Sequence, residues 1–205
     1  MLSFQTIQPD TLELLKAISA QAEIKETRLV GGTALALQYG HRQSIDLDFF
    51  GRLPEEKDEL IEAVKRVGEV TVLNRSKSVL QMVVNQVKVD FVDYSRYHWI
   101  DESIIGDGFV LASDKDIAAM KINAIIGRGT RKDFIDLYAL LQHYSLVEIM
   151  GFYQNKYPEF SEYRALLSMT YFDDAEMQDM PYMFIDTPWE QMKKTIIKAV
   201  EAYQQ

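Results

Sequence analysis

The 205-residue chain contains no cysteine, which excludes disulfide bonds and thiol chemistry but does not by itself decide the compartment. It also lacks any apolar run near the ~20 residues that a membrane-spanning helix requires. The N-terminal residues show neither the basic region nor the cleavage site of a secretory signal. We therefore expect a cytoplasmic protein without a membrane partner. Its hydrophobic and charged fractions, 47% and 26%, are typical of a globular protein that can bury a proper core.

Positive charge is scarce as well. The net charge of −9 argues against a general nucleic-acid binder, because such proteins are basic or carry a basic stripe. The cations gather in two places, Arg75 with Lys77 and Lys121 with Arg128, Arg131 and Lys132. A long duplex is therefore not the expected partner, whereas a small RNA that is contacted at one end remains compatible with the charge.

Several familiar catalytic patterns are missing. The three histidines, His41, His98 and His143, show no metal-ligand spacing. There is no Ser/His/Asp arrangement, no Walker-type Gly-Lys-Thr loop, no internal repeat and no low-complexity tract. His41 and Arg42 could contact a phosphate, and they also fit the role of ordinary loop residues.

What is present is the stretch Leu29 to Phe50, LVGGTALALQYGHRQSIDLDFF. It predicts a strand end, a tight turn at Gly31 and Gly32, a short buried helix from Thr33, a loop and a second strand. Backbone N–H groups at a helix start bind phosphate with help from the helix dipole, and glycine lets a ligand approach the backbone. Gly31, Gly32 and Thr33 are thus predicted to hold phosphates of a nucleotide, although an ordinary turn with a helix cap also fits this tripeptide.

The second strand of this stretch carries two carboxylates, Asp46 and Asp48. Residues two apart in a strand share a face, so these side chains should lie next to each other. Apolar neighbours on both sides indicate a buried strand rather than a solvated edge, and buried carboxylates are costly unless they are paired or bind metal. A hard divalent ion such as Mg²⁺ or Mn²⁺ meets that need. With the glycine turn, the pair predicts a site for a metal-bound nucleoside triphosphate (NTP).

A third carboxylate is expected from a later strand, Val87 to Val92. Alternation places Lys88, Asp90 and Val92 on one face, so strand pairing can bring Asp90 beside Asp46 and Asp48. Asp90 is therefore predicted as the third metal ligand, and a solvent-facing strand residue is the alternative. Asp93 is a weaker candidate because its parity assigns it to the apolar face or to the strand end.

The whole chain predicts an α/β fold with a mixed, twisted sheet of about five strands flanked by helices. We expect a core domain over residues 1–110 and a helical C-terminal region over 111–205 that packs on it. The capping patterns predict helices that start at Asp10 with Glu13, Ser113 with Asp116, Ser145 with Glu148, and Thr187 with Pro188 and Glu190. Residues 171–186 are expected to be irregular.

The pattern G-G-[ST]-x(12)-D-x-D resembles the nucleotidyltransferase superfamily that includes DNA polymerase β. With DIAAMKINAIIGRGTRKDFIDLYALL further along the chain, the sequence is similar to the AbiEii/AbiGii-type nucleotidyltransferases. That family includes toxins of toxin–antitoxin and abortive-infection systems. The resemblance extends from about Thr27 to the C-terminal helix.

The resemblance bears on three residues of the helical region. Lys121 lies on an otherwise apolar helix face, where it could extend its ammonium to the helix edge or neutralise triphosphate charge; the family's Asp-Ile-Ala-Ala-Met-Lys motif favours the second role. Asp133 and Asp136 share one helix face, as a surface ladder of ion pairs would. They match the family's Lys-Asp-x-x-Asp motif, and we assign Asp136 to orienting Lys121 or the substrate.

The resemblance implies transfer of a nucleoside monophosphate from an NTP to an acceptor hydroxyl. Asp46, Asp48, Asp90, Lys121 and Asp136 are the expected catalytic residues, and Lys121 is also expected to bind the nucleotide. An RNA acceptor such as a tRNA 3′ end and an antitoxin protein are the implied partners. A small-molecule or protein acceptor, or a nucleotide-binding module without turnover, are the alternatives.

Overall fold

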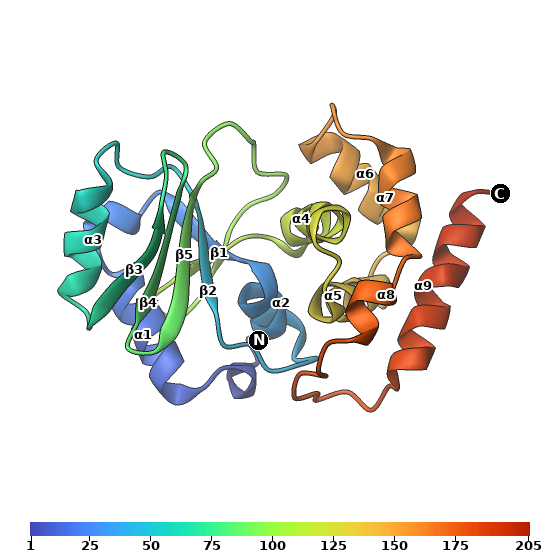
Figure 1. The fold of residues 1–205 in the computed structure, drawn as a ribbon, viewed down its shortest axis with the longest axis horizontal. Coiled ribbons are helices and arrows are strands. Elements are labelled where there is room, and N and C mark those ends of the chain that lie inside the picture. The colour runs from blue at the N-terminus through green and yellow to red at the C-terminus, as the bar shows by residue number, and fades with distance from the viewer. The chain divides into compact units, whose positions relative to one another are not determined.

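A computed structural model describes all residues of the chain, 1–205. They form two compact units. The first unit comprises residues 1–98 and 102–112 and contains the sheet, and the second comprises residues 99–101 and 113–205 and is helical (Figure 1). None of the helices has the length and apolar character that crossing a membrane would require.

The first unit is built on one mixed sheet of seven strands in the order β3-β4-β5-β2-β1-β7-β6. Strand pairs β2–β5 and β1–β7 are parallel and the remaining pairs are antiparallel. The strands are β1 (Thr27–Val30), β2 (Leu47–Gly51), β3 (Val70–Arg75), β4 (Val79–Val84), β5 (Val87–Asp93), β6 (Ile104–Ile105) and β7 (Val110–Leu111). The predicted α/β class is confirmed, and the sheet has two more strands than expected, both only two residues long.

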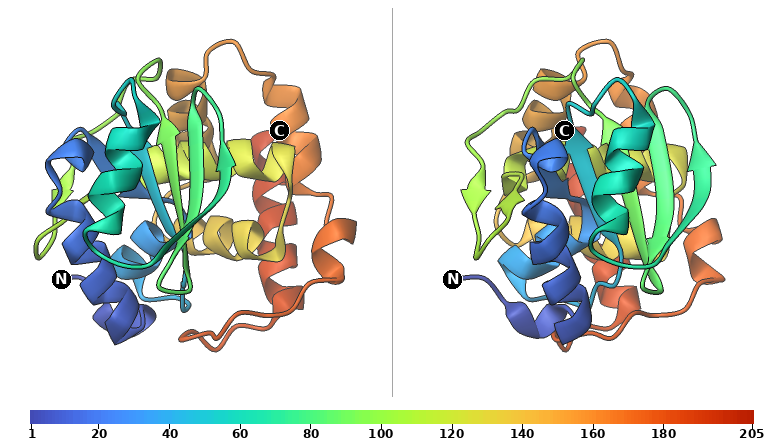
Figure 2. Two further views of the ribbon diagram at one scale, coloured as in Figure 1. Left: turned by 60° about the vertical axis from the view of Figure 1, so that its left-hand side comes forward. Right: turned by 90° about the vertical axis from the view of Figure 1, so that its left-hand side faces the viewer.

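One face of this sheet forms the core of the first unit. Burial alternates along β2, β4 and β5, so that Leu47 and Phe49 of β2 and Val89 and Phe91 of β5 are buried. The rings of Phe49 and Phe91 stack with centroids 5.2 Å apart. Helices α1 (Pro9–Ser19) and α3 (Lys57–Lys65) lie in front of the sheet in the right-hand view of Figure 2. The alternate residues of β2 and β5, including Asp48 and Asp90, therefore occupy the opposite face.

The remaining short helical elements of this unit are η1 (Phe4–Thr6), η2 (Ala22–Ile24) and α2 (Gly31–Tyr39). Helix α2 follows β1 directly and begins at Gly31, whereas the sequence predicted a turn at the two glycines and a helix from Thr33. It ends at Tyr39, and its C-cap Gly40 has φ of +69°, the left-handed conformation that glycine adopts without strain. The glycines thus form the first turn of the helix.

The hairpin between β4 and β5 turns at Asn85 and Gln86, as predicted. Both residues have positive φ, +47° and +69°, the signs of a type I′ turn, which matches the twist of the flanking strands. The turn sets the β4–β5 register in which Gln81 lies opposite Asp90.

The second unit contains six helices: α4 (Asp114–Gly127), α5 (Arg131–Leu141), α6 (Leu146–Lys156), α7 (Glu162–Met169), α8 (Asp173–Glu176) and α9 (Trp189–Tyr203). Helix α4 packs against α5, α6 and α7, and α9 packs against the same three helices. The predicted caps at Ser113 and Ser145 are confirmed, since each side chain accepts a hydrogen bond from the backbone three residues later.

Three helix predictions were wrong. Helix α1 starts at Pro9 with Gln8 as its N-cap, and α9 starts at Trp189 with Pro188 as its N-cap, so neither Asp10 nor Thr187 caps a helix. A proline fits the first position of α1 because its missing N–H would have no helical partner there. The segment 171–186, expected to be irregular, contains the one-turn helix α8.

A buried cluster within the second unit binds residues 99–101 to the start of α4. The carboxylate of Asp116 accepts hydrogen bonds from the backbone N–H of Ile100 at 2.8 Å and of Asp101 at 3.3 Å. It also lies 2.7 Å from the ammonium of Lys156, and both side chains are fully buried. That ammonium is 5.0 Å from the ring centroid of Trp99. The three-residue segment is therefore an integral part of the helical unit.

Candidate active site

Two of the predicted ligands, Asp48 and Asp90, lie opposite each other on adjacent strands. They are paired positions in the parallel register of β2 and β5, so their side chains project from the same sheet face. The alternation in each strand buries the residues on either side of them. The sequence prediction that strand pairing brings Asp90 beside Asp48 therefore agrees with the register.

Asp46 lies just outside this strand. Strand β2 begins at Leu47, so the prediction that Asp46 and Asp48 sit on one strand was wrong in this respect. The backbone carbonyl of Asp46 instead accepts a hydrogen bond from the Thr33 hydroxyl, whose oxygen also lies 2.8 Å from Ser44 Oγ. Thr33 is buried, and its side chain fastens α2 to the segment that leads into β2. Its assignment to phosphate binding stays a prediction.

Asp90 is held by two neighbours on its sheet face. Its Oδ2 accepts hydrogen bonds from Gln81 Nε2 at 3.0 Å and from Lys88 Nζ at 2.9 Å. Its Oδ1 is buried and has no hydrogen-bond partner. The hydrogen bond to Asp90 raises the pKa of Lys88, opposed by partial burial and supported by the charges of Asp90, Asp48 and Asp46. Lys88 and Gln81 were not among the predicted site residues.

The N-terminus of α2 meets the Asp48 carboxylate at Gly31. This residue has φ of +68°, and a Cβ atom added to it would lie 2.4 Å from Asp48 Oδ2. The N-cap Val30 offers no side-chain acceptor, so no side chain of the cap covers the first N–H groups of the helix. Gly31 therefore permits a close approach of the carboxylate to a helix N-terminus, where phosphate groups also bind favourably.

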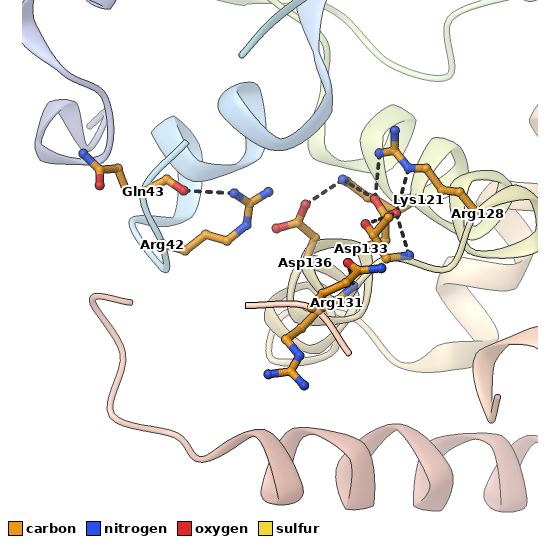
Figure 3. Close-up of polar contacts among 9 residues, drawn as sticks. Arg42, Gln43, Lys121, Arg128, Arg131, Asp133 and Asp136 are labelled. Atoms are coloured by element: carbon orange, nitrogen blue, oxygen red, sulfur yellow. Dashed lines mark hydrogen bonds and ion pairs between the residues drawn. The ribbon is translucent and has the colours of Figure 1, made fainter. Parts of the chain in front are cut away.

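Gly32 lies beside the buried Arg42, for which the sequence left open a phosphate contact or the role of an ordinary loop residue. A Cβ atom on Gly32 would be 2.3 Å from Arg42 Nη2, and Arg42 is only 2% exposed. Arg42 Nη1 donates to the carbonyl oxygen of Gln43 at 3.0 Å (Figure 3). A guanidinium next to the first turn of α2 adds positive charge where a phosphate is predicted. In the sequence, only the closeness of Arg42 to the Asp-x-Asp segment indicated that it could belong to the site.

The candidate metal ligands are of the chemical type that a hard divalent cation binds. Asp46, Asp48 and Asp90 offer carboxylate oxygens, the ligands that Mg²⁺ prefers, and the buried Oδ1 of Asp90 lacks a partner. No three His, Cys, Asp or Glu side chains of the chain stand close enough together to hold a metal ion as they are arranged. Closing a metal site would therefore require side-chain movement, and the three ligand assignments stay predictions.

The second unit places Lys121 in a buried ionic network (Figure 3). Its Nζ lies 3.0 Å from Asp133 Oδ1 and 2.6 Å from Asp136 Oδ2, and both carboxylates are fully buried. Arg128 donates to Asp133 through Nε and Nη2, and Thr130 donates to it through its hydroxyl. Burial opposes ionisation of Asp133, but the Lys121 and Arg128 cations outweigh it and hold its pKa well below the usual range.

This network changes two interpretations. Asp133 and Asp136 do not form a surface ladder, since α5 buries both against α4. Lys121 does not extend to the helix edge, because its ammonium is held by the two carboxylates. The prediction that Asp136 orients Lys121 is compatible with their 2.6 Å contact.

Arg131, one of the cations that gather near Lys121 in the sequence, is directed at its own unit. Its Nε donates to the carbonyl of Ala175 at 2.9 Å and its Nη2 to that of Glu176 at 2.8 Å. Its guanidinium also lies 5.0 Å from the ring centroid of Trp189. Arg131 therefore connects α5 with α8 and α9 and is not available as a phosphate contact.

The fold is that of a nucleotidyltransferase. The nucleotidyltransferase toxin MenT4 of Mycobacterium tuberculosis H37Rv superposes with a TM-score of 0.62 at 14% identity, covering 92% of this chain and 79% of that one. Protein JHP933 of Helicobacter pylori superposes with a TM-score of 0.57 at 16% identity, covering 98% and 93%. An uncharacterized protein of Aquifex aeolicus (strain VF5) is 30% identical over 203 residues, 96% of this chain and 97% of that protein.

The family model described as "Nucleotidyl transferase AbiEii toxin, Type IV TA system" matches residues 13–204. The chain therefore belongs to the AbiEii nucleotidyltransferase toxin family, as the sequence resemblance implied. It is a nucleotidyltransferase enzyme.

Proposed function

We propose that the protein transfers a nucleoside monophosphate from an NTP to the hydroxyl of an RNA acceptor, such as a tRNA 3′ end, and that it depends on Mg²⁺ or Mn²⁺. The observation that supports this best is the pairing of Asp48 with Asp90 on one sheet face, next to the glycine-rich N-terminus of α2. Carboxylates and a phosphate-binding helix start are the two halves of a site for a metal-bound triphosphate.

In the proposed reaction the acceptor oxygen forms a bond to the α-phosphorus while the bond to the pyrophosphate oxygen breaks, and pyrophosphate leaves with the electron pair. Asp90 accepts the proton of the acceptor hydroxyl. The first turn of α2, at Gly31 and Gly32, holds the outer phosphates. Lys121, oriented by Asp136, offsets the charge that develops on pyrophosphate. A divalent ion bound by Asp46, Asp48 and Asp90 would lower the pKa of the acceptor hydroxyl and stabilise the leaving group.

The acceptor is assigned to RNA on family membership together with the restricted basic surface. The acidic chain has few cations, and of those that gather near Lys121 in the sequence, Arg131 is discounted. Lys132 is exposed, and Arg128 is 64% exposed although it hydrogen-bonds Asp133, so these two are the proposed RNA contacts. The RNA is thus engaged locally. As a toxin, the active protein is expected to slow growth when expressed alone in the cytoplasm, and an antitoxin encoded nearby is expected to counteract it.

The test is incubation with each labelled NTP, Mg²⁺ and total RNA or cell extract. We expect label on RNA with the wild type and none with Asp48→Asn. Asp10→Asn, which changes an exposed carboxylate of α1 in the same unit, should retain transfer. Label found only on a small molecule or only on protein would keep the chemistry and change the acceptor. Full transfer by Asp48→Asn would place the active site elsewhere.

A further inference from the structure

Lys88 is a cation placed directly on a predicted metal ligand. It comes two residues before Asp90 in β5, on the same face, and its ammonium donates to Asp90 Oδ2 at 2.9 Å. Gln81, opposite Asp90 on β4, donates to the same oxygen. The lysine side chain is 45% exposed while that of Asp90 is 13% exposed. Lys88 therefore lies at the solvent side of this carboxylate rather than in the core.

The ammonium serves more than one carboxylate. Asp48 is the register partner of Asp90 on the adjacent strand, so the ammonium that contacts Asp90 lies on the sheet face that carries both carboxylates. Asp48 and Asp90, paired on one sheet face, repel each other, and a positive charge beside them lowers that repulsion. Lys88 thus supplies, within the protein, part of the charge compensation that a bound metal ion would supply.

Lys88 also occupies one of the two oxygens that Asp90 would offer to a metal ion. Asp90 Oδ2 is occupied by Lys88 and Gln81, whereas Oδ1 is buried, and no three acidic side chains converge. We infer that Lys88 acts as a resident cation, an ammonium of the protein that occupies Asp90 Oδ2 when no metal is bound. Its ammonium must leave this oxygen before a divalent ion can bind there. This inference rests on the proposed metal-dependent function and adds competition between an internal ammonium and the metal.

The test is the affinity for Mn²⁺ measured by electron paramagnetic resonance, without nucleotide and without turnover. Lys88→Met removes the competing charge but keeps a long side chain, so Mn²⁺ should bind about tenfold more tightly than to the wild type. Lys77→Met is the matched control, because it removes an exposed lysine from the β3–β4 connection in the same unit. Its Mn²⁺ affinity should equal that of the wild type.

A second pair of variants separates the inference from the proposed function. Asp48→Asn should lose Mn²⁺ binding; if it binds Mn²⁺ normally, the proposed metal site is wrong. Lys88→Arg keeps a cation and should bind Mn²⁺ much as the wild type does. If Asp48→Asn loses the metal but Lys88→Met binds it with unchanged or lower affinity, the metal site stands and the resident-cation role is overturned. Circular dichroism of each metal-free variant establishes that the fold is retained.

Discussion

Lys121 Nζ lies 2.6 Å from Asp136 Oδ2, and neither side chain is more than 5% exposed. A charge pair at this depth is maintained by mutual compensation, because loss of one partner leaves the other charged in a medium of low polarity. The pair belongs to helices α4 and α5, and Asp133 with Arg128 extends it. The ion network is therefore both a proposed part of the catalytic machinery and a determinant of the stability of the helical unit.

Lys121→Ala should accordingly lower the free energy of unfolding by about 3–5 kcal/mol, because Asp136 and Asp133 lose their shared cation. The double variant Lys121→Met/Asp136→Leu removes both charges of the close pair and should be more stable than Lys121→Ala. Urea denaturation of the two variants and of Asp136→Leu provides the comparison. Equal stability of Lys121→Ala and the wild type would show that the buried pair contributes nothing.

The same residue should affect turnover more than binding. Because Lys121 is proposed to act on charge that develops in the transition state, a variant that stays folded should lose kcat to a greater extent than NTP affinity. Lys121→Met is suited to this measurement since it removes the charge and keeps a long side chain. A variant with unchanged kcat would restrict Lys121 to a structural role.

Asp133 should make the protein sensitive to acid. Its pKa is lower in the folded state than in the unfolded chain, so its contribution to stability is complete above the unfolded value, about 4, and is lost as the pH falls toward the folded value. The wild type should therefore lose stability below about pH 4. Asp133→Asn should be less stable at pH 7 and show a smaller decline between pH 5 and 2, which thermal melts across this range would measure. A parallel decline in both proteins would contradict this assignment.

Gly31→Ala should disturb both the backbone and the site. The residue needs positive φ, and the new methyl group would collide with Asp48 Oδ2. We expect a loss of more than about 1 kcal/mol of stability and weaker metal-dependent NTP binding. Gly151→Ala is the control, since this glycine lies inside α6 and an added Cβ meets nothing within 4 Å. It should stabilise the protein by about 0.5–1 kcal/mol. Calorimetric melts with and without NTP separate the two effects.

Gln86→Gly should stabilise the protein. Gln86 adopts φ of +69° in the β4–β5 turn, a conformation that costs a side-chain-bearing residue about 1–2 kcal/mol. The greater freedom of glycine in the unfolded chain offsets part of this gain, so the net effect should be about 0.5–1 kcal/mol. Val87→Gly, one residue into β5, should have the opposite sign. Chemical denaturation of the three proteins tests the turn assignment.

Arg131 and Lys132 are adjacent in sequence and should behave differently. Arg131→Gln loses hydrogen bonds to two carbonyl groups and should cost about 1–3 kcal/mol of stability without changing the salt dependence of RNA binding. Lys132→Gln changes an exposed residue and should leave stability unaltered while lowering the salt slope by about 1. Titrations with RNA at several salt concentrations decide between them. Identical slopes for all three proteins would remove Lys132 from the proposed RNA contact.

The parts of the fold predicted well are those with a strong local pattern. Alternation in β5 was sufficient to set Asp90 on the polar face, and Ser113 and Ser145 capped their helices as their spacing indicated. Strands β6 and β7 could not be found this way, because two residues are too few to show alternation and β7 is defined by its pairing with β1.

In the candidate site too, features with a local sequence pattern were predicted and features that depend on tertiary packing were not. Residue type and spacing pointed to Asp48, Asp90 and the glycines, since these lie on regular elements close to one another. Burial of Asp133 and Asp136 depends on how α5 packs against α4. Without knowledge of that packing, charged residues on a helix are predicted to be exposed, because most charged residues are. The contact of Lys88 with Asp90 was within reach of sequence reasoning, because residues two apart on a strand share a face.

Residues 99–101 have a practical consequence for dissecting this enzyme into separate polypeptides. A fragment that starts at Ser113 would contain every helix of the second unit, yet Asp116 would lose the backbone N–H groups of Ile100 and Asp101. Lys156 would lose the indole ring of Trp99 at the same time. A fragment that starts at Tyr94 retains all of these contacts. We therefore expect the helical unit to fold on its own only when residues 99–101 are included.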